Sequence, residues 1–209
     1  MEKKSIILVV VAVLIIVGLF FASITFGKKE KDYKEIARDK LVKIDIKDYG
    51  SILVELDYDA APITVENFIR LVDNKFYDGL TFHRIMEGFM IQGGGYYQDG
   101  ERKTANTIKG EFELNGVENN LSHKRGIISM ARGQDYNSGS AQFFITVADK
   151  DTELDGRYAA FGKVLAGMEV ADKIVEEAKP TDDNGSITLN ERPVIEKIRL
   201  IDRTSYEED

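Results

Sequence analysis

The chain has 209 residues and a formal net charge of −8 at pH 7, and this acidic balance argues against nucleic-acid binding, which usually needs a basic face. It contains no cysteine, which excludes disulfides, thiolate metal sites, cysteine nucleophiles and a cysteine-linked lipid anchor. With only two histidines in the sequence, we also expect no histidine-rich metal centre.

The N-terminal end carries an apolar run that is long enough to cross a membrane. Residues 5–27 include no charged residue, and at about 1.5 Å per helical residue they span a hydrocarbon core about 30 Å thick. We expect residues 1–27 to be an uncleaved signal anchor that forms one transmembrane helix. A cleaved signal peptide and a secreted product are the alternative. Because a short basic head precedes the run, we place the rest of this single-pass cell-membrane protein outside the cytoplasm.

A charged stretch follows at residues 28–40, and its alternating signs predict a helical or flexible stalk. Apolar and polar residues then alternate over Val42–Ile46 and again over Ile52–Leu56, with a turn containing Asp and Gly between them. This pattern is typical of a β-hairpin. From Pro62 to Val72 the apolar residues take helical spacing, which predicts a helix.

Short strands dominate the rest of the chain. Four are expected, at Phe82–Ile85, Ile127–Ala131, Gln142–Val147 and Val194–Ile201. A second helix is expected at Met168–Val175, where apolar residues again take helical spacing. Many short strands with only two helices favour an antiparallel barrel or sandwich. We expect one domain over residues 41–203 and an acidic tail at 204–209.

Two segments, Phe82–Gly94 and Gly139–Ile145, combine amide and apolar side chains, and both are interpreted as strands. Because residues two apart share a strand face, Met90 and Gln92 would face the same way, and so would Gln142 and Phe144. Arg84 would supply a positive donor nearby. These groups predict a site for an uncharged, partly apolar, hydrogen-bonding ligand such as a peptide.

Successive segments resemble the blocks of the cyclophilin family, in the family's order and at about its spacing: Phe82–Gly94, Gly126–Ala131, Gln142–Ile145, and Leu154–Gly156 with Phe161–Val164. The resemblance runs from about Val42 to Ile201. It implies a mainly β fold, a closed eight-stranded antiparallel barrel capped by two helices. It also implies peptidyl-prolyl cis-trans isomerase activity without a cofactor, on proline-containing peptides and on unfolded or exported proteins. We expect a monomer.

Such an enzyme needs to break no covalent bond. Rotation about an X-Pro bond has a barrier of about 18–20 kcal/mol, and a catalyst need only favour the twisted state over the planar ones. In the twisted state the prolyl nitrogen can accept a hydrogen bond. The resemblance implies that Arg84 donates it, and that Gln92 steadies Arg84 and contacts the substrate carbonyl.

The resemblance also implies the substrate-binding residues: Phe89, Met90, Phe144 and Leu154 line the proline pocket, Tyr158 edges it, and Gln142 with the backbone at Ala131 and Arg132 binds the peptide main chain. Two positions depart from many eukaryotic relatives, which have Trp at Glu153 and His at Tyr158. That Trp helps to grip cyclosporin, so we expect weak inhibition by this drug.

The same residues have alternative interpretations. A non-catalytic proline-peptide binding module or chaperone could use the same groove. A hydrolase has little support, because no Ser or Asp stands beside a histidine in a plausible triad. We interpret His83 and His123 as structural. Gly93–Gly95 lacks the Lys of a phosphate loop, and Asp182–Gly185 lacks the spacing of an EF-hand, so a solvated turn is expected there.

Overall fold

The computed structural model describes residues 31–149 and 153–207. The expected transmembrane segment at residues 1–27 lies outside these described residues. Within them, no helix combines the length and the apolar character needed to span a bilayer. The chain divides into two compact units between Asp32 and Tyr33, and the second of these units carries all the elements described below.

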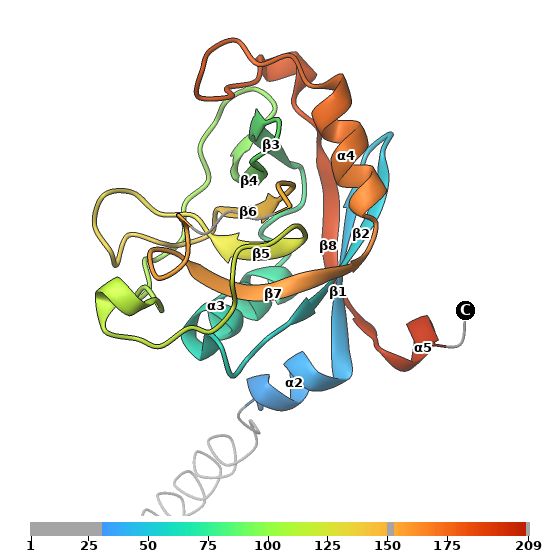
Figure 1. Ribbon diagram of the computed structural model, residues 1–209. Coiled ribbons are helices and arrows are strands. Elements are labelled where there is room, and N and C mark those ends of the chain that lie inside the picture. The colour runs from blue at the N-terminus through green and yellow to red at the C-terminus, as the bar shows by residue number, and fades with distance from the viewer. Residues whose placement is uncertain (1–30, 150–152, 208–209) are drawn as a thin grey trace, which may run out of the picture. The chain divides into compact units, whose positions relative to one another are not determined.

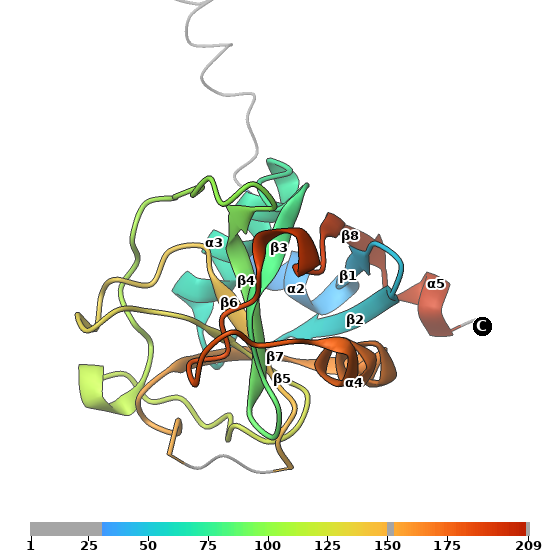
Figure 2. The same cartoon turned by 90° about the horizontal axis from the view of Figure 1, so that it is seen from above.

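Eight antiparallel strands form one sheet: β1 (Lys40–Ile46), β2 (Gly50–Leu56), β3 (Leu80–Met86), β4 (Met90–Tyr97), β5 (Ile127–Met130), β6 (Phe143–Thr146), β7 (Ala159–Ala166) and β8 (Ile195–Asp202). Their order is β3-β4-β6-β5-β7-β2-β1-β8, and the sheet curls around its core (Figures 1 and 2). The predicted mainly β, eight-stranded antiparallel fold is therefore confirmed.

The closure of the expected barrel is less complete than predicted. The two end strands, β3 and β8, meet at a single isolated bridge between Thr81 and Val194. Gly79 N–H donates to the Ile195 carbonyl across this seam, at 2.9 Å. Because a full ladder is missing between β3 and β8, the hydrogen-bonded sheet is better described as a half-barrel.

The β1–β2 hairpin shows why the alternating pattern predicted strands correctly. Its inward positions are buried and pair across the strands, Val42 with Val54 and Ile44 with Ile52. The turn between the strands uses left-handed backbone at Asp48, with φ of 66°, a conformation that Asp tolerates better than most residues.

Two longer helices pack on the sheet, α3 (Pro62–Asp73) and α4 (Met168–Glu177). Helix α3 begins with Pro62, whose missing N–H costs nothing in the first turn. Two of its free N–H groups, those of Ile63 and Thr64, donate to the buried carboxylate of Glu111 at 2.9 and 2.7 Å. Both predicted helices are confirmed, and η1 (Glu113–Asn115) and η2 (Leu189–Glu191) are short 3₁₀ turns.

Two short helices lie at the ends of the described chain, α2 (Tyr33–Asp39) and α5 (Thr204–Glu207). Helix α2 falls in the charged stretch expected as a stalk, yet its Ala37 is buried in the main core. Tyr33 and Ile36 pack against that core as well. From Tyr33 onward, the charged stretch is therefore part of the folded unit.

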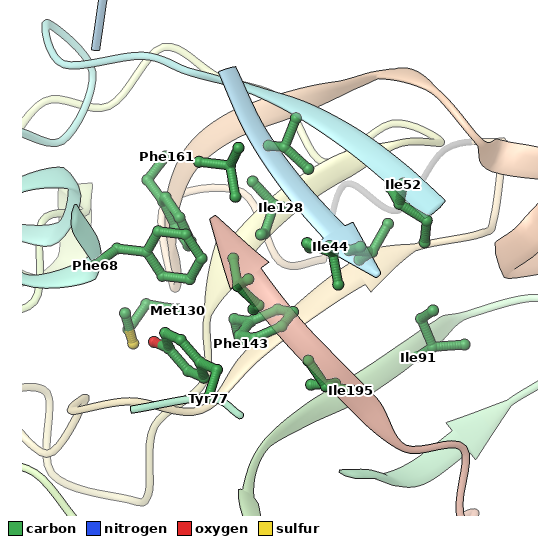
Figure 3. Packing of buried hydrophobic residues seen from close by; sticks show 14 of the residues in the cluster. Ile44, Ile52, Phe68, Tyr77, Ile91, Ile128, Met130, Phe143, Phe161 and Ile195 are labelled. Carbon is green, nitrogen blue, oxygen red and sulfur yellow. The ribbon is translucent and has the colours of Figure 1, made fainter. Parts of the chain in front are cut away.

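The main core fills the space inside the curled sheet beneath α3. Phe143 from β6 lies at its centre and packs edge-on against Phe68 of α3, Tyr77 and Phe82, with ring centroids 5.6 to 6.0 Å apart. Phe161 of β7 reaches Phe68 from another direction (Figure 3). This packing fixes β6, and with it the residues on the opposite face of that strand.

Candidate active site

Three neighbouring strands place Arg84, Gln92 and Phe144 in one row across the sheet. Arg84 of β3 lies opposite Gln92 of β4, and Gln92 lies opposite Phe144 of β6. Residues that face each other across antiparallel strands point to the same side of the sheet. Since the neighbouring Phe143 points into the core, this row lies on the outer face.

The Arg84 guanidinium is held at all three of its nitrogens. Its Nη1 donates to Oε1 of Gln92 at 3.2 Å, and Nε2 of Gln92 donates in turn to Oε1 of Gln142 at 3.0 Å. Its Nε donates to the carbonyl of Asn184 at 2.7 Å, and its Nη2 contacts the Met86 sulfur at 3.0 Å. Each terminal nitrogen carries a second hydrogen that these bonds leave for a ligand.

A small apolar cluster lies beside this row and is separate from the main core. Met90, Phe144 and Leu154 form it, with exposed fractions of 1, 5 and 9%. Four partly buried apolar residues surround it: Met86, Phe89, Ala131 and Tyr158. The guanidinium of Arg84 lies 5.8 Å from the centre of the Phe89 ring. The structure thus brings the predicted pocket residues together, next to the arginine.

The residues predicted to bind the peptide main chain are only partly available. Gln142 lies one residue before β6, and its amide faces Gln92. Ala131 borders the apolar cluster, but its N–H already donates to the Gln142 carbonyl at 2.9 Å. Its carbonyl is therefore the Ala131 backbone group that remains for a peptide.

The side chain of Arg132 packs against three aromatic rings. Its guanidinium lies 4.7 to 5.0 Å from the ring centres of Phe112, Tyr136 and Tyr158. Its Nε and Nη2 both donate to the Arg157 carbonyl, at 3.0 and 2.9 Å. Arg132 thereby holds the ring of Tyr158, which in turn meets Phe144 edge-on at 5.7 Å.

A polar network centred on His123 packs against Phe144 of the apolar cluster. The His123 ring stacks on Phe144 with centroids 6.0 Å apart. Its Nδ1 lies 2.8 Å from the Asp155 carboxylate, and its Nε2 lies 3.0 Å from the Ser129 hydroxyl. Burial alone would raise the pKa of Asp155, but the hydrogen bonds from the His123 backbone, Ser122 and the His123 ring together lower it.

This network corrects one premise of the sequence analysis, which found no Ser or Asp beside a histidine. Asp155, His123 and Ser129 do stand in the order of a hydrolase triad. Yet Ser129 and His123 are 0 and 1% exposed, so the hydroxyl cannot reach a substrate carbonyl. Spacing along the chain gave no signal for this network, because the fold alone brings the three residues together.

His83 lies beside Arg84 but packs against Tyr96, with ring centroids 4.8 Å apart. Its Nδ1 is buried and lacks a hydrogen-bond partner in the described part of the chain. Burial, and then the nearby charge of Arg192, lower the pKa of His83 to about 4. The ring is therefore neutral at physiological pH.

Sequence reasoning missed two groups that hold the arginine, the Met86 sulfur and the Asn184 carbonyl. Met86 follows Arg84 by two residues, so strand periodicity could have indicated it. The Asn184 carbonyl comes from a distant loop, and a backbone acceptor leaves no signature in the residue types. Across residues 31–149 and 153–207, no group of three His, Asp or Glu side chains could hold a metal ion.

The fold and the site together define a class: an antiparallel half-barrel with an apolar cluster beside a fixed guanidinium on its outer face. A family model described as "Cyclophilin type peptidyl-prolyl cis-trans isomerase/CLD" matches residues 41–201. The chain belongs to this cyclophilin family. The predicted cyclophilin family is confirmed by this match.

Curated relatives agree with the family. The chain is 46% identical over 130 residues to peptidyl-prolyl cis-trans isomerase A of Dickeya dadantii, covering 60% of this chain and 66% of the relative. It is 41% identical over 134 residues to peptidyl-prolyl cis-trans isomerase B of Escherichia coli, covering 60% of this chain and 79% of the relative. The match thus spans just under two thirds of the first relative and more of the second.

A solved structure has the same fold. The crystal structure of a Cryptosporidium parvum cyclophilin type peptidyl-prolyl cis-trans isomerase, determined in the presence of the dipeptide Ala-Pro, is 27% identical. The superposition has a TM-score of 0.63 and covers 78% of this chain and 99% of that chain.

Proposed function

We propose that this chain accelerates rotation about X-Pro bonds in folding proteins by a non-covalent mechanism, with Arg84 as its main catalytic residue. The proline ring would rest on Met90, Phe144 and Leu154, while the segment before it turns. A free N–H of the guanidinium would then donate to the prolyl nitrogen as its conjugation is lost. Gln92 would keep the arginine in place and contact the substrate carbonyl.

The observation that carries this proposal is the series of hydrogen bonds from Arg84 through Gln92 to Gln142 beside the apolar cluster. A guanidinium stays charged at any physiological pH and offers donors in a rigid plane. Held beforehand by three contacts, it needs little rearrangement as the bond twists. The apolar residues next to it exclude water, which strengthens its interaction with the nitrogen.

Substrate binding would combine the pocket with main-chain contacts. The amide of Gln142 lies next to Gln92, and Ala131 borders the apolar cluster, so Gln142 and the Ala131 carbonyl can bond a peptide backbone. Arg132 would act through Tyr158, whose ring it holds. Recognition of backbone and proline alone would admit many sequences, which suits proline-containing peptides and unfolded proteins as substrates.

Exchange NMR on an Ala-Pro peptide tests the mechanism with the full-length chain and its Arg84→Ala variant. We expect the variant to lose about 100-fold in catalysed exchange, the usual effect of removing one preorganised donor, while peptide affinity changes less than threefold. The Arg84→Lys variant keeps the charge but loses the planar fork, and we expect it to remain impaired. Equal losses of exchange and affinity in Arg84→Ala would instead favour a proline-peptide binding module or chaperone.

We further propose that residues 1–27 anchor the protein in the cell membrane and that the isomerase domain works outside the cytoplasm on exported proteins. The support is the uncharged run at residues 5–27 behind a short basic head. Protease added to intact cells should remove the domain and leave a membrane-bound stub. Full protection in intact cells, with cleavage only after lysis, would contradict this orientation.

A further inference from the structure

The turn between α4 and β8, at residues 181–186, runs alongside the strand that carries Arg84 (Figure 2). Ser186 forms an isolated bridge with Arg84. On either side of it, Ile85 N–H donates to the Gly185 carbonyl at 2.8 Å, and Ile187 N–H donates to the His83 carbonyl at 3.1 Å. The turn therefore pairs with β3 at the outer edge of the sheet, over the residues that flank the arginine.

The same turn reaches the guanidinium directly. The Asn184 carbonyl accepts the Nε–H of Arg84 at 2.7 Å, the shortest of the guanidinium's three contacts. Because a guanidinium is planar, a bond at Nε fixes the plane in which both terminal nitrogens lie. With Nε held from the loop side, Nη1 is directed to Gln92. The acceptor is a backbone atom, so its position depends on the shape of the turn.

The shape of the turn is fixed by its own hydrogen bonds. Oδ1 of Asp182 accepts the N–H groups of Asn184 and Ser186, both at 3.0 Å. The Ser186 N–H is the main reason why the pKa of Asp182 lies below its usual range. The Thr181 N–H and hydroxyl both donate to the Ser186 carbonyl, at 2.8 and 3.0 Å. One oxygen of the Asp182 carboxylate is thus held by two backbone amides of the same turn.

Gly185 lets the turn come this close to β3. It has a φ of +81°, and a Cβ built there would lie 2.4 Å from the Ile85 carbonyl oxygen and 2.5 Å from Cγ of Met86. Both contacts are far shorter than a carbon atom tolerates. Any side chain at this position would push the turn away from β3, and the Asn184 carbonyl would move with it.

We propose that residues 181–186 are a positioning strap, which sets the orientation of the Arg84 guanidinium through the Asn184 carbonyl and is itself held in shape by Asp182 and Gly185. This inference rests on the proposed function of Arg84 and adds to it the residues that aim the catalytic group. Asp182 and Gly185 act on Arg84 through the Asn184 carbonyl, so they are positioning residues.

The test compares full-length variants by exchange NMR on an Ala-Pro peptide. We expect Asp182→Ala to lower kcat/KM three- to tenfold with peptide affinity unchanged, and Gly185→Ala to lower it more than tenfold. Asp182→Asn keeps the Oδ1 acceptor and should restore most of the rate. Asp99→Ala is the matched control, because Asp99 is exposed, accepts the Glu101 N–H at 2.9 Å and lies at the far end of β4. It should retain the full rate.

Two readouts separate positioning from a general loss of structure. The Nε–H resonance of Arg84, assigned by its disappearance in Arg84→Lys, should exchange slowly with water in the native chain and at least tenfold faster in Asp182→Ala. In addition, Asp182→Ala should have no further effect on the rate when Arg84 is already alanine. A normal rate and an unchanged Nε–H in Asp182→Ala would overturn the strap.

The outcomes for the strap and for the mechanism are distinct. If Arg84→Ala lost activity while Asp182→Ala and Gly185→Ala kept it, the strap would be wrong and the mechanism would stand. If Arg84→Ala kept its activity, the mechanism would be wrong, and the Nε–H exchange in Asp182→Ala would still decide whether the turn orients the guanidinium.

Discussion

Phe143 and Phe144 are consecutive residues of one strand that serve two different apolar clusters. Phe143 points into the main core and meets three aromatic rings. Phe144 points outward, where the cluster that it shares with Met90 and Leu154 is bordered by partly buried residues. A closed cluster stabilises the fold, whereas an outer cluster with an accessible rim keeps apolar surface for a ligand. The two faces of β6 therefore have different roles: the inner face stabilises the fold, and the outer face offers apolar surface to a ligand.

The largest effect should come from Phe143→Ala. Removing a fully buried ring from a packed core costs about 3–5 kcal/mol of unfolding free energy, which is a large part of the stability of a domain. Urea denaturation should show a much lower midpoint with a similar slope. A loss below 1 kcal/mol would mean that the two clusters do not differ as described.

His83, the neighbour of Arg84 in β3, should make the unfolding free energy depend on pH. The pKa of His83 is about 4 in the folded chain and about 6.5 in an unfolded one. As pH falls from 6.5 to 4, the unfolded chain gains a proton that the folded one resists, so the unfolding free energy should fall. The full shift corresponds to at most about 3 kcal/mol.

Urea midpoints measured between pH 7 and pH 4 check this expectation, with His83→Gln as the control. Because glutamine does not titrate, the urea midpoint of the variant should fall less between pH 6.5 and pH 4 than the midpoint of the native protein. Carboxylates such as Asp155, whose pKa is lowered, act further into the acid range and remain in both proteins. An identical fall of the urea midpoint with pH in the two proteins would contradict the assigned pKa of His83.

Phe144→Ala tests the outer cluster in the same way as Phe143→Ala tests the main core. We expect it to cost less stability than Phe143→Ala, about 1–2 kcal/mol, because its cluster is already open at the rim. Its effect on a proline peptide should be greater, with affinity reduced at least tenfold, or about 1.4 kcal/mol. Titration calorimetry and urea denaturation on the same samples measure both quantities. A variant that unfolds like Phe143→Ala yet binds normally would reverse the roles of the two rings.

The smallest expected effect concerns the drug cyclosporin. An exposed Glu153 stands where many eukaryotic relatives have the tryptophan that helps to grip the drug, so we expect weak inhibition. Titration of the drug in the exchange assay measures it, and Glu153→Trp should tighten inhibition by about tenfold, as one aromatic contact would. Tight inhibition of the native chain would contradict this expectation.

Local patterns predicted the elements well but not the contacts between distant ones. The alternation in β1 and β2 and the helical spacing after Pro62 are set by burial on one face, which a sequence displays directly. The incomplete β3–β8 seam depends on how far the sheet curls, and α2 was hidden because charged residues surround its buried Ala37. Neither feature is encoded in the spacing of nearby residues.

The same difference separates two groups of residues in the candidate site: those in short sequence motifs and those that support them from distant parts of the chain. Arg84, Gln92 and Phe144 belong to short motifs that the resemblance singled out, and they lie opposite one another on adjacent strands. The supports came from elsewhere in the fold: His123 and Asp155 beneath Phe144, and the Asn184 carbonyl behind Arg84. Such supports act by packing and by backbone atoms, which residue types alone do not identify.

The inclusion of α2 in the folded unit moves the start of the folded domain back to Tyr33, eight residues before the family match begins at residue 41. Ala37 of α2 is buried in the main core, and Tyr33 and Ile36 pack against that core. A truncated version that starts at residue 41 would therefore expose apolar core surface, and a stable one should start upstream of Tyr33.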